Sequence, residues 1–129
     1  MIPKELLYTK EHEWIRVEGD TGMIGITDHA QSALGDITYV ELPKVGKLYA
    51  INETIGTVES VKTVSEVFCP VSVEVLEVNA TVNDQPELVN SDPYGQGWFV
   101  KVKIRKPEEL SKLLNAAEYE AYSAESQRH

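Results

Sequence analysis

Cysteine is nearly absent from this sequence of 129 residues, where Cys69 is the single one. One cysteine cannot form an intramolecular disulfide, and secreted proteins of this size usually carry several. The composition therefore favours a reducing compartment. The three histidines are scattered along the chain and Cys69 has no second cysteine at ligand spacing, so the sequence predicts no zinc site.

Basic residues and long apolar runs are scarce as well. Lys and Arg total 12 against 21 Asp and Glu, which gives a formal net charge of -9. This charge repels phosphate backbones and anionic lipids, so we expect neither nucleic-acid binding nor membrane binding. No apolar stretch approaches the ~18 residues of a membrane span, and the N-terminal residues lack the apolar run of a signal peptide. The sequence thus shows no targeting segment.

The remaining composition is that of a globular protein, and the length suits one domain. From Tyr8 to Arg105, short β-branched and aromatic runs alternate with turn residues, which predicts a mainly β structure. Residues 107 to 125 have helical spacing instead. We therefore predict a single domain over residues 1–129, with a β body at about 8–105 and a C-terminal helical segment at about 107–125.

Local signals predict four short helices. Asp28 and Gln31 form a capping-box pattern, and Gly35 stands where a helix ends. A second helix is expected to start at Pro86, a third at Pro107, and a fourth after a cap at Asn115. We expect residues 123–129 to fray.

One lysine is unusual because of its surroundings. Between Leu48 and Val100 the sequence has eight acidic residues, and Lys62 is the only Lys or Arg. The ordinary interpretation is a surface charge paired with Glu59 or Glu66. However, Lys62 follows Val61 at the predicted tip of a hairpin, where two-residue turns normally need Gly, Asn or Asp. Such a violation of local rules is typical of functional sites.

The chemistry of this position indicates attachment rather than catalysis. Neighbouring carboxylates favour a protonated amine, whereas nucleophilic lysines are usually desolvated or placed beside another cation. Elsewhere, Ser60 and Ser65 lack a positioned base, and Gly95–Gly97 matches no phosphate-binding loop. An enzyme is therefore the weakest hypothesis.

The segment Glu59–Glu66 resembles the lysine site of the glycine cleavage system H proteins, in which that lysine carries lipoic acid through an amide. Ten further blocks resemble this family, in the family's order and over residues 8 to 122. They are His12–Trp14, Gly25–Gln31, Leu34–Ile37, Tyr39–Pro43, Pro70–Ser72, Glu74–Val75, Glu77–Asn79, Pro86–Asn90, Asp92–Gly95 and Gly97–Trp98. Any one block is weak, but ten in register are strong.

The resemblance implies a barrel-sandwich hybrid, the flattened β-barrel of two antiparallel sheets found in lipoyl and biotinyl domains, with C-terminal helices. Two positions depart from the family pattern. Val73 stands where the family commonly has Gly, which questions the turn geometry there. Asn52 also replaces a common Gly, and Asn is the next-best residue for a left-handed turn.

The resemblance also implies a non-catalytic shuttle with lipoic acid on Lys62. Its implied partners are glycine decarboxylase (P protein), aminomethyltransferase (T protein) and dihydrolipoamide dehydrogenase (L protein), together with a lipoate-protein ligase or lipoyl transferase. A carrier that visits several active sites is expected to be a monomer, in the bacterial cytoplasm or, as a mature eukaryotic chain, in the mitochondrial matrix.

Four acids are candidates for docking the loaded arm or for recognition by the lipoylating enzyme. A protonated, hydrolysable aminomethyl cargo is best held out of water and near carboxylates. Glu13 is the first candidate for docking, followed by Glu66 and Glu11, while Glu66 and Glu59 flank the lysine where a lipoylating enzyme would bind.

Three alternatives stay open. A lipoate relay protein, which passes lipoyl groups to other enzymes, would show the same motif. Biotinyl domains usually place Met on both sides of the lysine, and neither they nor the lipoyl domains of 2-oxo-acid dehydrogenases normally carry the terminal blocks. An unmodified acidic interaction module is a hypothesis of another class, against which the intact Lys62 argues.

Overall fold

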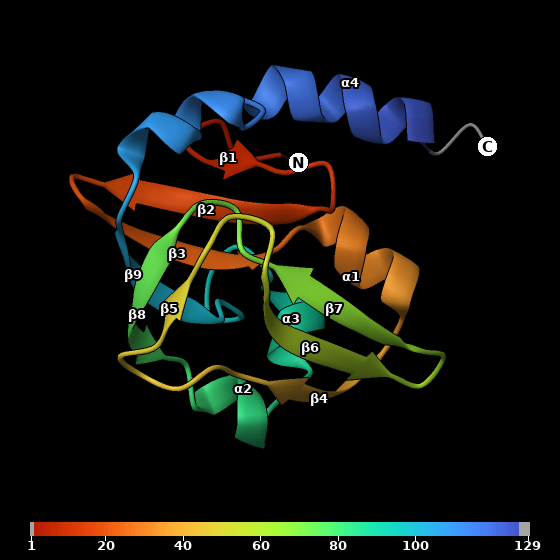
Figure 1. Cartoon of the computed structure of the whole chain (residues 1–129). Helices are drawn as coiled ribbons and strands as arrows, with labels where there is room; N and C mark the ends of the chain where they lie inside the picture. The colour runs from red at the N-terminus through yellow and green to blue at the C-terminus, as the bar shows by residue number, and fades with distance from the viewer. Residues whose placement is uncertain (1, 127–129) are drawn as a thin grey trace.

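The computed structural model describes residues 2–126, which form two antiparallel sheets surrounded by short helices (Figure 1). The larger sheet has the order β1-β2-β3-β9-β8-β5 and the smaller one the order β4-β6-β7. The strands are β1 (Leu7–Tyr8), β2 (Glu13–Glu18), β3 (Thr21–Ile26), β4 (Ile37–Glu41), β5 (Leu48–Tyr49), β6 (Thr54–Ser60), β7 (Val64–Phe68), β8 (Val73–Val78) and β9 (Val100–Ile104). The predicted mainly β architecture is confirmed.

A single main core joins the two sheets. Ile15 and Ile24 from the larger sheet and Val58 and Val67 from the smaller one belong to the same buried cluster. The pattern follows from period-two alternation, because only every second side chain of a strand faces the core. Each sheet therefore keeps an outward face, and strands β6 and β7 contribute to the outward face of the smaller sheet.

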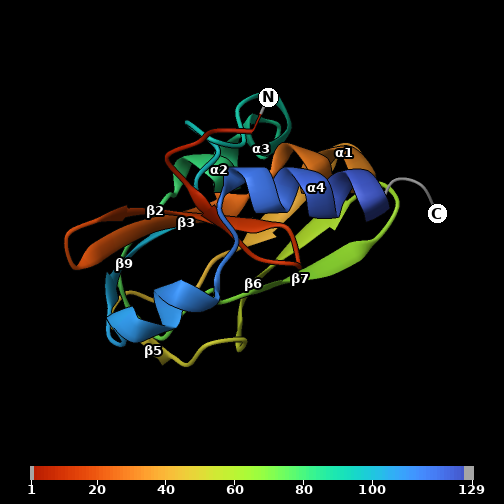
Figure 2. The same cartoon turned by 90° about the horizontal axis from the view of Figure 1, so that it is seen from above.

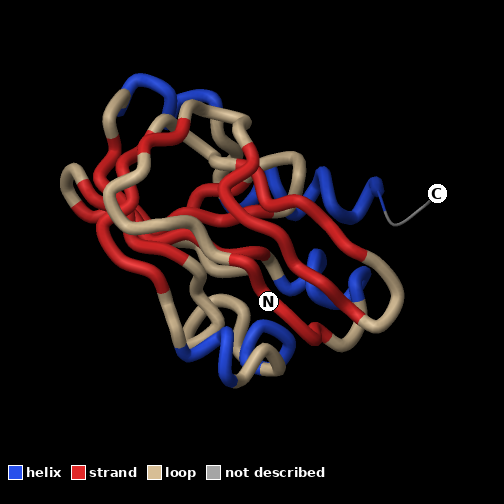
Figure 3. The backbone as a smooth tube through the Cα atoms, turned by 60° about the horizontal axis from the view of Figure 1, so that its bottom comes forward, coloured by secondary structure: helices blue, strands red, loops and turns tan. Residues whose placement is uncertain are grey.

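The helices lie outside the sheets (Figure 3). They are α1 (Asp28–Leu34), α2 (Thr81–Asp84), α3 (Leu88–Ser91), the 3-10 helix η1 (Pro107–Lys112) and α4 (Ala116–Ser126). Within residues 2–126, no helix is both long and apolar enough to cross a bilayer.

Several predicted helix boundaries need correction. The N-cap of α1 is Thr27, whose hydroxyl accepts from the Ala30 amide, while Asp28 lies inside the helix and its carboxylate accepts from Gln31. Helix α3 begins at Leu88 rather than Pro86, and the segment after Pro107 is a 3-10 helix. Helix α2 has four residues and no side-chain cap, so the sequence carried no signal for it.

The C-terminal helix confirms one prediction and contradicts another. Asn115 caps α4 as expected, because its side chain and that of Glu118 exchange bonds with each other's backbone amides at 2.9 Å. Fraying from Ser123 is wrong, since α4 continues to Ser126 and Ser123 is buried. Residues 127–129 lie outside the described residues.

Helix α4 packs across the larger sheet (Figure 2). A second apolar cluster lies there, formed by Leu6, Tyr8, Trp14 and Tyr119. The Tyr8 and Tyr119 rings stack with centroids 4.6 Å apart. This cluster attaches the C-terminal helix to the start of β2, which is also where Glu13 lies.

The two departures from the family pattern fit the fold. Asn52 adopts a left-handed conformation at φ 71°, as expected for a residue in place of glycine. Val73 instead begins β8, fully buried and paired with Tyr49 and Ile104. A β-branched residue suits that strand position, so no glycine is needed there.

Candidate functional site

Strands β6 and β7 form a hairpin that projects from the body and carries Lys62 in its connection (Figure 1). The strands pair from Thr54 opposite Phe68 to Glu59 opposite Val64. Residues 61–63 therefore form the tip, one residue longer than the predicted tip of Val61 and Lys62, because β7 begins at Val64. Lys62 lies at its centre, in the connection where the sequence predicted it.

The tip does not need the left-handed backbone conformation, which Val and Lys adopt only with strain. Neither Val61 nor Lys62 is among the positive-φ residues of the described chain. Instead, the Ser60 hydroxyl accepts from the Lys62 amide at 3.2 Å and from the Thr63 amide at 3.1 Å. The expected violation of turn rules is thus resolved by Ser60, whose side chain replaces a backbone acceptor.

Lys62 is exposed and makes no ion pair among residues 2–126. Two other lysines have partners: Lys101 lies 3.7 Å from Glu77, and the Lys47 ammonium lies over the Tyr49 ring. The ordinary interpretation of Lys62 as a charge paired with Glu59 or Glu66 is therefore wrong.

The hairpin rests on the corner where α1 leads into β4. The Val61 amide donates to the Asp36 carbonyl at 3.1 Å. The Lys62 side chain crosses Gly35 so closely that a Cβ atom on Gly35 would stand 2.9 Å from Lys62 Cε. We call residues 35–37 the hairpin seat. The sequence predicted Gly35 as a helix end but gave no signal that it also makes room for the lysine.

Glu59 and Glu66 lie on the outward face of the hairpin. Val58 and Val67 face the core, so alternation directs Glu59 and Glu66 to the opposite side. Glu66 is exposed and accepts a bond from Thr54 at 3.1 Å. The same region exposes two apolar side chains, Val61 at 68% and Val64 at 61%. The lysine is thus bordered by carboxylates and apolar groups that a partner protein can contact.

Glu13 occupies a different environment, with 2% of its surface exposed. Its Oε1 accepts from the Thr9 hydroxyl at 2.6 Å and its Oε2 from the Phe68 amide at 3.1 Å, which connects the start of β2 to the end of β7. Burial raises the pKa of Glu13 to about 7, although both hydrogen bonds act in the opposite direction.

Glu11 lies near Glu13, because its charge also contributes to the raised pKa of Glu13. Glu11 itself is exposed. The four candidate acids thus form two groups. Glu11 and Glu13 lie where β2 meets the end of β7, and Glu59 and Glu66 share the outward face of the hairpin.

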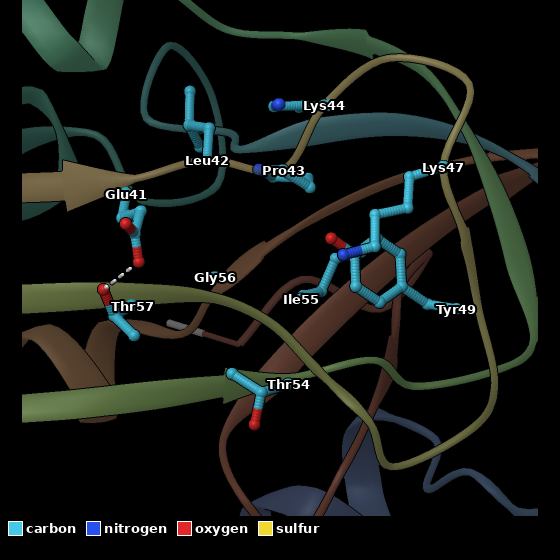
Figure 4. Close-up of a pocket in the computed structure, with 10 residues that line it drawn as sticks. All are labelled: Glu41, Leu42, Pro43, Lys44, Lys47, Tyr49, Thr54, Ile55, Gly56 and Thr57. Carbon is cyan, nitrogen blue, oxygen red and sulfur yellow. Dashed lines mark hydrogen bonds between the residues drawn. The ribbon is translucent and has the colours of Figure 1, made fainter.

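A separate shallow pocket of about 310 Å³ lies between β6 and the loop after β4 (Figure 4). Lys44 and Lys47 line it, and Glu41 accepts a bond from Thr57 at its edge. Lys62 does not line this pocket. Within residues 2–126, no three potential metal ligands cluster.

Comparison with known proteins agrees with this geometry. The model of the family described as "Glycine cleavage H-protein" matches residues 6–126, almost the whole chain. The chain belongs to the glycine cleavage H-protein family. Family membership makes it a lipoyl carrier of the glycine cleavage system, working with that system's P, T and L proteins as a carrier and not as an enzyme.

Relatives support the family over nearly full length. A glycine cleavage system H protein of Symbiobacterium thermophilum is 54% identical, covering 96% of this chain and 97% of that protein. One of Geobacillus kaustophilus is 58% identical, covering 92% and 94%. The crystal structure of an H protein from Mycobacterium marinum superposes with a TM-score of 0.86 at 39% identity, covering 98% of this chain and 99% of that one. These relatives are bacterial.

Proposed function

We propose that Lys62 carries the lipoyl group through an amide on Nζ. The observation that carries this assignment is the position of Lys62, exposed at the tip of a projecting hairpin and inside the segment Glu59–Glu66 that resembles the family's lysine site. Gly35 leaves room for the lysine stem that would hold the group, because a Cβ on Gly35 would lie 2.9 Å from Lys62 Cε. Amide formation removes the charge of Lys62 and takes the formal net charge from -9 to -10.

When bound, the lipoyl group supplies a disulfide that takes up the aminomethyl group of glycine as it is reduced. The chain supplies position: it presents Lys62 to the glycine decarboxylase, to the aminomethyltransferase and then to the dihydrolipoamide dehydrogenase that restores the disulfide. Attachment to one flexible side chain raises the effective concentration at each encounter. The hairpin places Lys62 at one end of the smaller sheet, outside the core, which suits successive visits to several active sites.

The test of attachment is the intact mass of the protein after incubation with lipoate, ATP and a lipoate-protein ligase. We expect one lipoyl adduct on the wild type and none on Lys62→Arg, with circular dichroism and thermal unfolding of the two proteins alike. No adduct on the folded wild type would leave Lys62 as a displayed side chain of an interaction module.

The two groups of acids support two roles. Glu59 and Glu66 flank Lys62 on the exposed face, which suits recognition by the lipoylating enzyme. Glu13 and Glu11 suit the protonated amine of the cargo. Because burial penalises the charged form of Glu13, a cation brought to its carboxylate would lower the pKa of that group and be stabilised in return.

We expect Glu13→Gln to accelerate hydrolytic loss of the aminomethyl cargo from the loaded protein, because a neutral amide lacks the negative charge that stabilises an ammonium group. Ammonia release over time measures this rate. Glu59→Gln is the control, since it should slow lipoylation and leave cargo loss unchanged. Equal rates of loss in wild type and Glu13→Gln would remove Glu13 from the docking site.

The proposed setting follows from the same observations. The apolar clusters link the β body and the C-terminal helices, which supports one lipoyl-carrier domain over residues 1–129. The exposed hairpin supports a carrier that works as a monomer. Its place of action is the cytoplasm of a bacterium or, for a mature eukaryotic chain, the mitochondrial matrix, and the single buried Cys69 agrees with either.

A further inference from the structure

Asn90 forms three side-chain hydrogen bonds around the hairpin seat, although it lies on α3. Its Nδ2 donates to the Gly35 carbonyl at 2.9 Å and to the Gln31 side-chain oxygen at 2.8 Å. Its Oδ1 accepts from the Ile37 amide at 2.9 Å. Turning the amide over would place like groups against each other at all three positions, so the orientation is fixed.

These bonds satisfy backbone groups that would otherwise have no partner, at the end of α1 and at the start of β4. Gly35 leaves α1 with φ 83°, and its carbonyl is one of the last carbonyls of the helix that have no partner within it. The Asn90 side chain provides that partner. By also holding the Ile37 amide, it fixes both ends of the three-residue corner.

The corner in turn supports the lysine. The Asp36 carbonyl, which accepts from the Val61 amide, lies between the two residues that Asn90 holds. Gly35, over which the Lys62 stem runs, is one of those two residues. Asn90 therefore does not contact Lys62 directly, but it holds Gly35, which does.

Resting on the proposed attachment at Lys62, we propose that Asn90 is a positioning residue for lipoylation, one that fixes the hairpin seat and thereby presents the Lys62 amine to the lipoylating enzyme. Ser60 shapes the turn internally, whereas Asn90 sets how the turn lies on the body. Helix α3 has a second anchor besides this side chain, because the neighbouring Val89 is fully buried in the main core.

The chain offers a matched control in Asn79. Its side chain also makes three hydrogen bonds, donating to the carbonyls of Gln96 and Trp98 at 2.8 Å and accepting from the Thr81 amide at 3.3 Å. None of these partners belongs to the hairpin seat. Asn79→Ala therefore removes as many bonds as Asn90→Ala without touching the corner.

The first measurement is hydrogen exchange at the Val61 amide in the unmodified protein. We expect Asn90→Ala to lower the protection of this amide by ~10-fold or more relative to its effect on the buried Val102 amide, because the loss of fixed partners frees the corner. Asn79→Ala should lower the protection of the Val61 and Val102 amides by the same factor. This readout does not depend on whether Lys62 is ever modified.

The second measurement is the rate of lipoylation, followed by intact mass at several protein concentrations with a lipoate-protein ligase. KM rises by the inverse of the fraction that presents the lysine correctly, while kcat is kept, so a ~10-fold rise in KM means that about a tenth of the Asn90→Ala population still does so. If Asn90 only stabilised the fold, both Asn79→Ala and Asn90→Ala would lower the concentration of folded substrate, and KM would rise equally in the two variants.

A conservative variant adds a rescue. Asn90→Asp keeps the acceptor for Ile37 but loses both donors at neutral pH, so the Val61 amide should be unprotected at pH 8. Protonation of the new carboxyl restores one donor, and protection should return as the pH falls through the pKa of that group.

Unchanged Val61 protection in Asn90→Ala would overturn the proposal, and so would a KM shift shared equally with Asn79→Ala. Absence of any lipoyl adduct on the wild type would instead overturn the assignment of Lys62, and the exchange result would still decide whether Asn90 fixes the seat.

Discussion

Gly35 serves two purposes at one position. Its backbone lies at φ 83° and ψ -158°, a region almost confined to glycine, and its missing side chain leaves the path along which the Lys62 stem runs. A helix end and a support for the attachment lysine are thus combined in one residue.

Gly35→Ala should therefore differ from a glycine substitution that costs backbone strain alone. We expect a loss of roughly 1–3 kcal/mol in unfolding free energy, together with a raised KM for lipoylation as the new methyl displaces Lys62. Gly19→Ala is the control, since Gly19 also has positive φ but has nothing within 4 Å of an added Cβ. Urea unfolding and mass-based lipoylation assays measure both effects, and a normal KM in Gly35→Ala would contradict the contact.

For single residues, the sequence showed which charged side chains are unusual but not which groups they bond to in the fold. Lys62 stood out because no other basic residue lies near it in the sequence. The role of Ser60 was missed, because its hydroxyl acts on the two amides that follow it in a conformation that residue type alone does not specify. Glu13 was found as an acid, but its burial depends on Thr9 and Phe68 and could not be predicted.

Among the elements, α1 is fastened at both ends by side chains from distant parts of the chain. At its end, Asn90 holds Gly35. At its start, the Tyr119 hydroxyl lies 2.7 Å from the Thr27 hydroxyl and 2.7 Å from His12 Nδ1. Burial and the neighbouring His29 lower the pKa of His12 to about 4, so His12 is neutral at physiological pH. Helix α4 is thereby connected to the N-cap of the helix that ends at the hairpin seat.

We expect Tyr119→Phe to keep the ring stacked on Tyr8 while losing both hydrogen bonds, at a cost of about 1–3 kcal/mol. Faster hydrogen exchange at the Ala30 amide, which Thr27 caps, should accompany the loss. Tyr122→Phe removes one bond to the Lys10 carbonyl and should leave Ala30 unaffected. The idea fails if the Ala30 amide exchanges equally in both variants.

Elements defined by neighbouring residues were predictable. The cap of α4 lies within four residues, Asn115 to Glu118, and was found from sequence. The cap of α1 was misplaced by one residue, since Thr27, Asp28 and Gln31 all have side chains able to cap. Strand β5 has two residues and depends on pairing with β8, which no local pattern reveals.

For the whole molecule, one buried acid should control how stability depends on pH. The pKa of Glu13 is about 7 in the folded protein against an ordinary 4.5. The folded state therefore binds more protons between these values, and its stability falls as the pH rises through this window. The full penalty, roughly 3 kcal/mol, persists above about pH 7.

Glu13→Gln should remove this dependence, because the amide can still accept from Phe68 and donate to Thr9 without becoming charged. We expect the variant to gain stability relative to wild type between pH 5 and pH 8. Urea midpoints at both values test this, and parallel pH profiles of the two proteins would show that Glu13 is not the controlling group.

The order of the larger sheet was beyond local prediction. Strand β9 lies between β3 and β8, and it pairs Thr21 with Lys103 and Val78 with Val100. This arrangement depends on contacts across some 80 residues, whereas alternation within a strand predicts only which side is buried. The family resemblance, and not periodicity, carried the expectation of two sheets in a flattened barrel.

The central place of β9 has a consequence for the order of events during synthesis. A ribosome releases the β6–β7 hairpin long before residues 100–104 emerge, so a nascent chain already bears Lys62 while the larger sheet still lacks its middle strand. Until then, the corner beneath the lysine has no folded body to hold it. We therefore expect ligases to act on finished chains, and truncated chains that end before β9 to be poor substrates even though they contain the attachment lysine.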